Sequence, residues 1–361
     1  MSLQHYVSLG KSGLRVSPLC LGAMTFGEEW GWGTTPEVSV RILDLYMDRG
    51  GNFIDTANGY TKGHSETIIG GHLGRLSAKR DRMVIATKFF TNMYAGDPNG
   101  GGASRKAIVE SCDQSLRRLQ TDYIDLYWMH AWDRFTPIEE TMRALDDLVS
   151  AGKVRYIGFS DTPAWKVTQA QVTALLRGWT PLIALQLEYS LIERTIEGEL
   201  IPAALELGLG VTPWSPLKSG VLSGKYTREN AAQSNPGRGA RVVNNLNEQT
   251  FRILDVLGSV AREVGSTHAR VALSWVQARA SVASTIIGAR TPEQLEDNLG
   301  ALDVKLTAAQ ATALEEVSRP KLNFPFDFVR NVGTFGYNGA TINGETFLTN
   351  PLGPKNDAER F

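Results

Sequence analysis

The sequence predicts an α/β fold, a single (β/α)8 (TIM) barrel with an N-terminal β-hairpin and an irregular C-terminal tail. Three observations predict it. The chain has 361 residues, enough for one large barrel, and short apolar runs alternate with amphipathic helical patterns along it. The alternation occurs eight times, and no change in composition interrupts it, as expected for one closed parallel sheet. A doubly wound open sheet is the structural alternative.

The expected strands and helices follow one another in order. Residues 14–22 come after a Gly-Lys-Ser-Gly turn, so they are expected to complete a hairpin and lead into the first barrel strand. The other strands are expected at residues 53–57, 83–89, 124–130, 154–160, 182–190, 211–217 and 284–289. The helices are expected at residues 36–49, 64–76, 104–119, 138–151, 164–177, 199–207, 248–264, 268–280 and 291–299.

The C-terminal part departs from this rhythm. A polar segment, residues 218–247, separates the seventh strand from the next helix. We place the barrel at about residues 14–302 and a C-terminal helix and tail at 303–361, all within one domain of residues 1–361. Because residues 321–361 are rich in Gly, Asn and Pro, we expect an irregular tail that lies over the barrel.

Charge and composition exclude several classes of partner. The formal net charge is -1, which gives no electrostatic case for binding nucleic acid or an anionic membrane. No apolar run is long enough to span a membrane, and the polar first ten residues lack the apolar core of a secretory signal. Cys20 and Cys112 fall within a strand and a helix, as expected for buried free thiols in a reducing compartment. We therefore expect a cytoplasmic protein.

Ionisable residues stand at the ends of three consecutive strands. Asp55 is carried by the second strand and is followed by Tyr60, Lys88 ends the third, and His130 ends the fourth. Active sites of such barrels lie at the carboxyl ends of the strands. Each residue alone suits a structural role, because polar groups at strand ends often only satisfy the backbone. Together, at equivalent positions, they predict one shared site, since buried charges need partners.

The four residue types suit the reduction of a carbonyl group. A carbonyl that receives a hydride needs a proton on its oxygen, and Tyr60 can donate it. The ammonium of Lys88 is expected to lower the pKa of that phenol, whose ordinary value is near 10. Asp55 can hold Lys88 in place and charged. His130 can donate a hydrogen bond that orients the carbonyl and stabilises its developing negative charge.

At these positions the sequence resembles the aldo-keto reductase family. Asn-Phe-Ile-Asp-Thr-Ala-Asn-Gly-Tyr (52–60) is similar to the family segment that carries the catalytic Asp and Tyr, Ile-Ala-Thr-Lys (85–88) to its lysine strand, and His130 to its histidine. Tyr-Ile-Asp-Leu-Tyr (123–127) and Gly-Lys-Val-Arg-Tyr-Ile-Gly (152–158) are also similar to family signatures. The resemblance extends from about residue 7 to residue 302. It implies reversible reduction of a small aldehyde or ketone with NADPH.

The resemblance also implies a nicotinamide cofactor bound across the barrel mouth. A Rossmann site is not supported, because no Gly-x-Gly-x-x-Gly turn opens a βαβ unit near the N-terminus. Ser160, Asp161 and Gln186 would hold the nicotinamide carboxamide, and Trp214 would stack on its ring. The other positions that match family cofactor contacts are Gly22, Met24, Thr25, Asp55, Ser215, Pro216, Leu217, Ser219, Lys225, Gly288 and Asp297.

The segment after the eighth strand favours NADPH over NADH. Arg290, Gln294 and Asn298 are four residues apart in turn, so they share one helix face near its N-terminus, where anions bind. An arginine there suits the adenosine 2′-phosphate through paired hydrogen bonds. A solvated helix face is the structural alternative. Asp161 departs from the family, which more often has Asn, and an ionised Asp accepts hydrogen bonds but cannot donate them.

Aromatic residues after the first, third and fourth strands are expected to wall an apolar pocket over the carbonyl site. They are Phe26, Trp30, Trp32, Phe89, Tyr94 and Trp132. Some aromatics after strands only anchor loops. The sequence names neither the carbonyl substrate nor the direction of reaction nor the oligomeric state.

Two other classes of function are alternatives. One is a cofactor-binding regulatory subunit, because Trp-Ser-Pro-Leu (214–217) and Glu-Gln-Leu-x-x-Asn (293–298) also resemble segments of voltage-gated potassium-channel beta subunits. A turnover assay separates it from an enzyme. The other is a barrel hydrolase or lyase that uses Asp55 and His130, for which the sequence shows no metal-ligand spacing.

Overall fold

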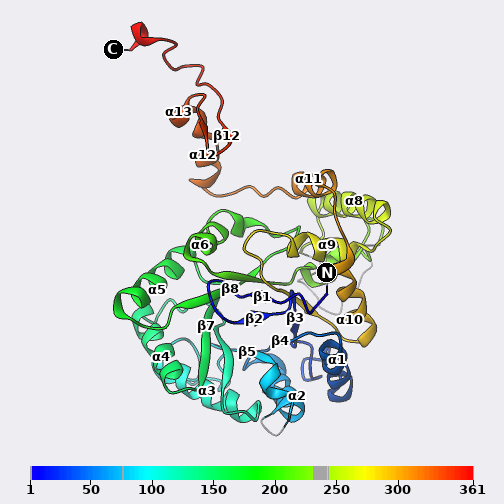
Figure 1. Ribbon diagram of the computed structural model, residues 1–361. Coiled ribbons are helices and arrows are strands. Elements are labelled where there is room, and N and C mark those ends of the chain that lie inside the picture. Colours follow the sequence, from blue (N-terminus) through cyan, green and yellow to red (C-terminus); the bar gives the residue numbers. More distant parts are fainter. Residues whose placement is uncertain (1, 75–76, 231–241, 243, 361) are drawn as a thin grey trace.

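Eight parallel strands form a barrel, and their order around the sheet follows the chain (Figure 1). The computed structural model describes residues 2–74, 77–230, 242 and 244–360. A parallel bridge between Val211 and Val282 joins the two ends of the sheet and closes the barrel. The predicted (β/α)8 barrel is therefore confirmed. Its strands are β3 (Leu19–Gly22), β4 (Phe53–Asp55), β5 (Val84–Phe89), β6 (Ile124–Met129), β7 (Val154–Ser160), β8 (Leu182–Glu188), β9 (Gly210–Trp214) and β10 (Thr285–Gly288).

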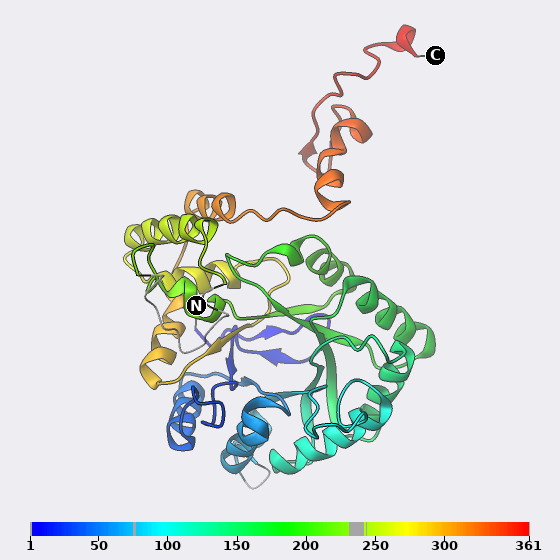
Figure 2. The same cartoon turned by 180° about the vertical axis from the view of Figure 1, so that it is seen from behind.

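Helices surround the sheet, and several begin where the sequence supplies a capping side chain. The hydroxyls of Thr35, Ser104, Thr267 and Thr291 each accept a hydrogen bond from a backbone N–H of the first turn. Figure 2 shows the same ring of helices from behind. The helices are α1 (Pro36–Asp48), α2 (His64–Leu73), α3 (Arg105–Arg118), α4 (Ile138–Ser150), α5 (Ala164–Arg177), α6 (Leu200–Leu207), α8 (Glu248–Glu263), α9 (His268–Gln277), α10 (Pro292–Leu299) and α11 (Ala308–Val317).

The predicted hairpin, β1 (Val7–Ser8) and β2 (Arg15–Val16), lies across the end of the barrel where the strands begin (Figure 1). Leu9 and Val16 are fully buried there and pack on the side chains that fill the barrel interior. A larger core lies between the outer faces of the strands and the helices. The hairpin leaves the opposite end, formed by the carboxyl ends of the strands, as the barrel mouth.

Element ends differ from the predictions by a few residues. α2 ends at Leu73, because Gly74 follows in an extended conformation. Residues 75–76 of the predicted helix lie outside the described residues, as do 231–241 and 243 of the polar segment. The seventh barrel strand ends at Trp214 rather than at residue 217, because Ser215 has a positive φ of 53°.

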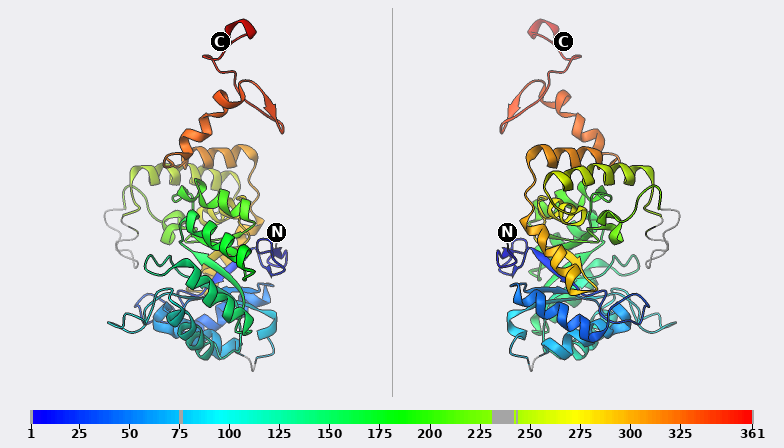
Figure 3. Two further views of the ribbon diagram at one scale, coloured as in Figure 1. Left: turned by 90° about the vertical axis from the view of Figure 1, so that its left-hand side faces the viewer. Right: turned by 90° about the vertical axis from the view of Figure 1, so that its right-hand side faces the viewer.

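The C-terminal tail does not lie over the barrel, so this expectation was wrong. Figure 3 shows it projecting away from the barrel. It folds on itself instead, since the rings of Tyr337 and Phe347 lie 4.6 Å apart and Asn350 donates a backbone hydrogen bond to the side chain of Asn338 at 2.8 Å. Its elements are α12 (Phe326–Asn331), α13 (Gly333–Tyr337) and the hairpin β11 (Thr341–Ile342) and β12 (Glu345–Thr346).

Candidate active site

Because side chains alternate along a strand, three of the predicted catalytic residues and Gln186 point into the barrel mouth. Side chains two residues apart on a strand share a face. The interior core contains Phe53, Ala86, Trp128 and Ala184. The residues that follow these by two positions are Asp55, Lys88, His130 and Gln186. They therefore occupy the next layer, at the carboxyl ends of the strands.

Lys88 is the centre of a buried polar cluster. Its ammonium forms an ion pair with Asp55 and donates hydrogen bonds to the Thr56 carbonyl at 2.8 Å and to the Tyr60 hydroxyl at 3.2 Å. Lys88 is fully buried, and Asp55 is only 2% exposed. Gln186 donates from Nε2 to the second carboxylate oxygen of Asp55 at 2.9 Å. Both members of the ion pair thus have several partners, which a buried pair requires to be stable.

A tight turn carries Tyr60 from the end of β4 to its place beside Lys88. Thr61 and Lys62 in this turn have positive φ values of 45° and 59°. The Thr61 hydroxyl donates to the Phe26 carbonyl at 2.7 Å and so fixes the turn against the loop after β3. The rings of Tyr60 and His130 meet edge-on, with their centroids 5.7 Å apart. The structure therefore brings all four predicted catalytic residues together.

The electrostatics of this cluster correct one prediction. Burial raises the pKa of the Tyr60 phenol above its ordinary value, and Asp55 adds to this effect, so that the opposing ammonium of Lys88 does not lower the pKa as expected. Burial by itself would lower the pKa of Lys88, but Asp55 and Tyr60 hold that pKa above its ordinary value. Burial, with a contribution from Lys88, lowers the pKa of His130 to about 3. At neutral pH the site thus holds a phenol, an ammonium and a neutral imidazole.

Asp161 and Trp214 form a second polar contact at the mouth. The indole Nε1 of Trp214 donates to Oδ1 of Asp161 at 3.1 Å, and Asp161 has a positive φ of 42°. The Asp161 side chain is accessible from the mouth. Even so, desolvation by the surrounding protein raises the pKa of its carboxyl to about 6. The negative charge of Glu188 adds to this rise, and the hydrogen bond from Trp214 opposes it. Glu188 itself pairs with Lys218 at 2.7 Å.

Helix α10 and the residue before its N-cap carry several residues predicted to contact the cofactor. Arg290 precedes the helix, so it does not share a helix face with Gln294 and Asn298 as predicted. Arg290 is exposed, and its backbone N–H donates to the Gln294 side chain at 2.9 Å. Within the part of the chain that the structure describes, the Arg290 guanidinium forms no ion pair. Asn298 is buried and donates to the Gly288 carbonyl at 3.1 Å, whereas Asp297 pairs with Arg270 at 2.8 Å. Asn298 therefore stabilises the loop between β10 and α10, and the ion pair with Arg270 holds the side chain of Asp297.

The loops after β3 and β10 are tied together beside this helix. The buried hydroxyl of Thr25 donates to the Ala289 carbonyl at 2.8 Å, and Met24 beside it is partly buried. Gly22 pairs with Gly288, and a Cβ on Gly22 would lie 2.7 Å from the Ile286 side chain. The strands can therefore approach this closely only with glycine at position 22.

The segment after β9 is strained. Ser215, Lys218 and Ser219 all have positive φ values, of 53°, 46° and 56°. Such conformations in residues other than glycine are costly and cluster at ligand sites. Of the other residues predicted here, Pro216 is buried, Leu217 is partly buried and Lys225 is exposed, while Ser160 is buried at the end of β7 beside Gln186.

Burial divides the six predicted pocket aromatics. Phe26 and Phe89 are fully buried in the core between strands and helices, so they offer no surface to a substrate. Trp30 contacts Trp32 at 5.4 Å and Tyr60 at 6.2 Å between ring centroids, which places both tryptophans beside the phenol. Trp132 packs edge-on against Trp165 at 5.5 Å. Tyr94 is 52% exposed on the loop after β5.

Sequence reasoning missed Trp165 and the pair of Glu188 and Lys218. Trp165 is 57% exposed in the first turn of α5, the helix after β7, so the rule that selected aromatics after other strands could have found it. Glu188 ends β8, and the same rule for ionisable strand ends applies to it. The Asp161–Trp214 hydrogen bond joins two segments 53 residues apart and has no sequence signal.

The described residues contain neither a candidate metal site nor a helix suited to cross a membrane. Among them, no group of three or more His, Cys, Asp or Glu side chains is arranged to hold a metal ion. No helix in the described ranges has both the length and the apolar character that crossing a membrane requires. Cys20 and Cys112 are buried free thiols, as predicted.

Comparison with known proteins gives a consistent result. The sequence profile of the Aldo/keto reductase family matches residues 18–319. An uncharacterized oxidoreductase of Bacillus subtilis is 41% identical over 84% of this chain and 92% of its own length. Norsolorinic acid reductase B of Dothistroma septosporum is 36% identical over 96% of this chain and 90% of its own length. An aryl-alcohol dehydrogenase [NADP(+)] of Phanerodontia chrysosporium is 36% identical over 87% of this chain and 86% of its own length.

Proposed function

Because the chain belongs to the aldo-keto reductase family and is an oxidoreductase, we propose that it reduces an aldehyde or ketone with NADPH, using Tyr60 as the proton donor. One observation carries the proposal. The Tyr60 hydroxyl lies 3.2 Å from the Lys88 ammonium, which is itself paired with Asp55 in the barrel mouth. A phenol in this position keeps its proton at neutral pH and can release it to an acceptor whose basicity rises during the reaction.

The cluster can move one proton in a defined direction. When bound, the reduced nicotinamide supplies a hydride to the carbonyl carbon. The Tyr60 O–H bond then breaks, its proton passes to the carbonyl oxygen, and the phenolate that is left is stabilised by the adjacent Lys88 ammonium. Asp55 and the Thr56 carbonyl hold that ammonium in place. In the reverse direction the same phenolate accepts the alcohol proton.

His130 is suited to orient the carbonyl rather than to protonate it. Its pKa of about 3 leaves the ring neutral at neutral pH, so one ring nitrogen carries a hydrogen and the other does not. The ring stands edge-on to Tyr60. A carbonyl oxygen placed between the two rings would accept one hydrogen bond from the imidazole and one from the phenol.

The mouth offers groups that fit a nicotinamide cofactor. The strained segment from Ser215 to Ser219 and the exposed Arg290 at the N-terminus of α10 support the binding of a phosphorylated ligand there. Arg290 would hold the 2′-phosphate, Ser219 and Lys225 would border the pyrophosphate, and Trp214 would stack on the nicotinamide. Ser160, Asp161 and Gln186 would bind its carboxamide. The relative whose name includes NADP(+) supports this choice of cofactor.

An aromatic carbonyl compound is the substrate class that the mouth favours. Trp30 and Trp32 lie on one side beside Tyr60, and Trp132 and Trp165 form a second ring pair. Aromatic faces gain from stacking against a flat ring. The aryl-alcohol dehydrogenase among the relatives supports the same class.

A turnover screen tests the proposal. Consumption of NADPH is followed with aliphatic aldehydes, aromatic aldehydes, ketones and sugars, for the wild type and for Tyr60→Phe. The variant keeps the ring and loses the hydroxyl, so reduction should fall about 100- to 10,000-fold while NADPH still binds. Tyr123→Phe is the matched control, because Tyr123 directly precedes β6, at the opposite end of the barrel, where its hydroxyl donates to Asp81. NADPH binding without turnover of any carbonyl would instead favour a regulatory protein.

A further inference from the structure

Large apolar side chains are concentrated on the C-terminal arm, residues 323–360. Eight of the seventeen large hydrophobic side chains that are exposed in the described residues lie on it. They are Phe324, Phe328, Val329, Phe335, Tyr337, Ile342, Leu348 and Leu352. Leu348 and Leu352, which are distant from the barrel, are 77% and 87% exposed. A protein that functioned alone would rarely expose so many large apolar side chains on one segment.

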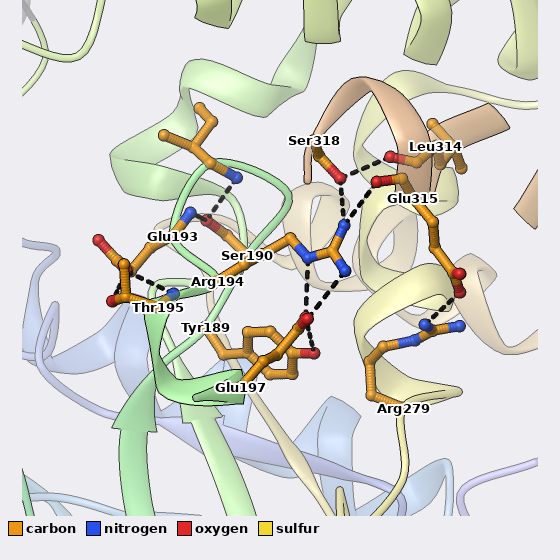
Figure 4. A network of polar contacts seen from close by, with 11 residues as sticks. Tyr189, Ser190, Glu193, Arg194, Thr195, Glu197, Arg279, Leu314, Glu315 and Ser318 are labelled. Atoms are coloured by element: carbon orange, nitrogen blue, oxygen red, sulfur yellow. Dashed lines mark hydrogen bonds and ion pairs between the residues drawn. The ribbon is translucent and has the colours of Figure 1, made fainter. Parts of the chain in front are cut away.

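The arm is a preformed element with a fixed root. Inside it, Tyr337 stacks on Phe347, and backbone hydrogen bonds join Gly339 to Leu348 and Phe347 to Ala340. The root is the end of α11, which Figure 4 shows clamped to the barrel by Arg194. Arg194 is buried, pairs with Glu197 at 2.7 Å, and donates to the Glu315 carbonyl at 2.9 Å and to the Ser318 hydroxyl at 2.8 Å.

The clamp directs the arm away from its own barrel. Leu322 is buried directly before the arm, and its backbone N–H donates to the Asp327 side chain at 3.1 Å. In all views the arm then extends outward beyond α6 (Figures 1 and 3). The contacts of Arg194 and the burial of Leu322 therefore hold the chain against the barrel up to the start of the arm.

The barrel carries a second unpartnered apolar surface close to this root. Val172, Leu175 and Leu176 share one face of α5 and are 45%, 82% and 78% exposed, and Leu205 on the adjacent α6 is 53% exposed. The outward face of a barrel helix is normally polar. We call these four side chains the α5–α6 patch. In Figure 1 the arm projects past α6, and both the arm and the patch expose their apolar side chains in the part of the molecule that the structure describes.

We propose that the arm of one copy of this chain packs on the α5–α6 patch of a second copy, and the reverse, in a two-fold dimer. Every copy carries both surfaces, and a two-fold axis near the arm root lets each arm reach the other barrel at the same time. A stable interface needs about 20 to 30 residues on each side. The arm, residues 323–360, is longer than that, and the apolar character of the arm and the patch matches the core of a homodimer interface.

Sedimentation velocity of the full chain tests the dimer and its two surfaces. The wild type should sediment as a dimer at low micromolar concentration. Leu348→Lys/Leu352→Lys on the arm and Leu175→Lys/Leu176→Lys on the patch should each raise the dissociation constant by at least about 100-fold, because two buried leucines are lost at each of two equivalent contacts. Phe135→Lys is the control, since Phe135 is 82% exposed on the loop before α4 and belongs to neither surface, and its dimer should persist.

Mixing the two variants identifies which surfaces meet. The arm variant has an intact patch and the patch variant has an intact arm, so a mixture can form one complete arm–patch contact. The mixture should therefore associate where neither variant does alone. A wild-type monomer, a dimer that survives both pairs of substitutions, or variants that dissociate without any recovery on mixing would each overturn the proposal. The last result would mean that arm packs on arm and patch on patch in the same dimer.

Discussion

Removing the ammonium of Lys88 should destabilise the protein far more than removing an exposed lysine. Lys88 is fully buried and forms its ion pair with Asp55, which is 2% exposed. Lys88→Met fills the space but leaves the Asp55 carboxylate buried, with the Gln186 amide as its remaining donor. Breaking a buried pair on one side costs about 3 to 5 kcal/mol, so the free energy of unfolding should fall by that amount.

Adding Asp55→Asn to Lys88→Met makes the test specific for the ion pair. In Asp55→Asn/Lys88→Met both charges are gone, and the amide can still accept from Gln186, so the double variant should be more stable than Lys88→Met alone. Non-additivity of this kind isolates the interaction between the two side chains. The double variant should still be inactive, because Tyr60 has lost the ammonium beside it.

Urea unfolding followed by tryptophan fluorescence measures these differences. Lys106→Met is the control: Lys106 pairs with Glu110 on the surface of α3, where both side chains are more than half exposed, and its removal should leave the unfolding midpoint almost unchanged. If Lys88→Met lost less than about 1 kcal/mol, the pair would behave like a surface ion pair and the argument from burial would be refuted.

Three further predictions concern the cofactor, the proton and Asp161. Arg290→Ala should weaken NADPH binding by about 1.5 to 3 kcal/mol and NADH binding much less, measured by fluorescence titration; equal losses would show that Arg290 does not bind the 2′-phosphate. Alcohol oxidation should speed up continuously as pH rises towards the raised pKa of Tyr60, and Tyr60→Phe should abolish this slope. The pKa of Asp161 is about 6 in the folded protein against an ordinary value of 3.8, so the folded protein binds this proton more tightly than the unfolded chain does. The free energy of unfolding should therefore fall as the pH rises from about 3.8 to about 6. Asp161→Asn should remove this loss of stability, and an unchanged pH profile of the unfolding midpoint would contradict the assignment.

The sequence was sufficient to predict the barrel and the convergence of Asp55, Lys88, His130 and Gln186. The reason is geometric: in a closed parallel sheet, the alternation of side chains and the direction of the strands bring equivalent strand ends to one mouth. These four positions depend on periodicity, which is a local property of the sequence.

Burial and chain direction could not be predicted in the same way. Phe89 looked like a pocket residue, but it is fully buried, and the chain turns sharply at Phe90, whose φ is 111°. The pKa of Tyr60 was expected to fall because Lys88 is near, yet the burial of the phenol outweighs that charge. The tail was expected to cover the barrel, and contacts between Tyr337 and Phe347 fold it on itself instead. Each outcome depends on contacts between residues that composition alone does not specify.

The residues proposed to transfer the proton and the residues proposed to select the substrate belong to different parts of the molecule. The proposed proton donor and its supports are fixed by a mutual ion pair and by hydrogen bonds to strand ends, so changing any one of them disturbs the others. Trp30 and Trp32 lie on the loop after β3, Trp132 lies on the loop after β6, and Trp165 lies in the first turn of α5. Their ring contacts join Trp30 to Trp32 and Trp132 to Trp165. Loops tolerate substitution better than strand ends do. Exchanging the loops after β3 and β6 should therefore change KM between substrates while leaving the Asp55–Lys88 pair intact.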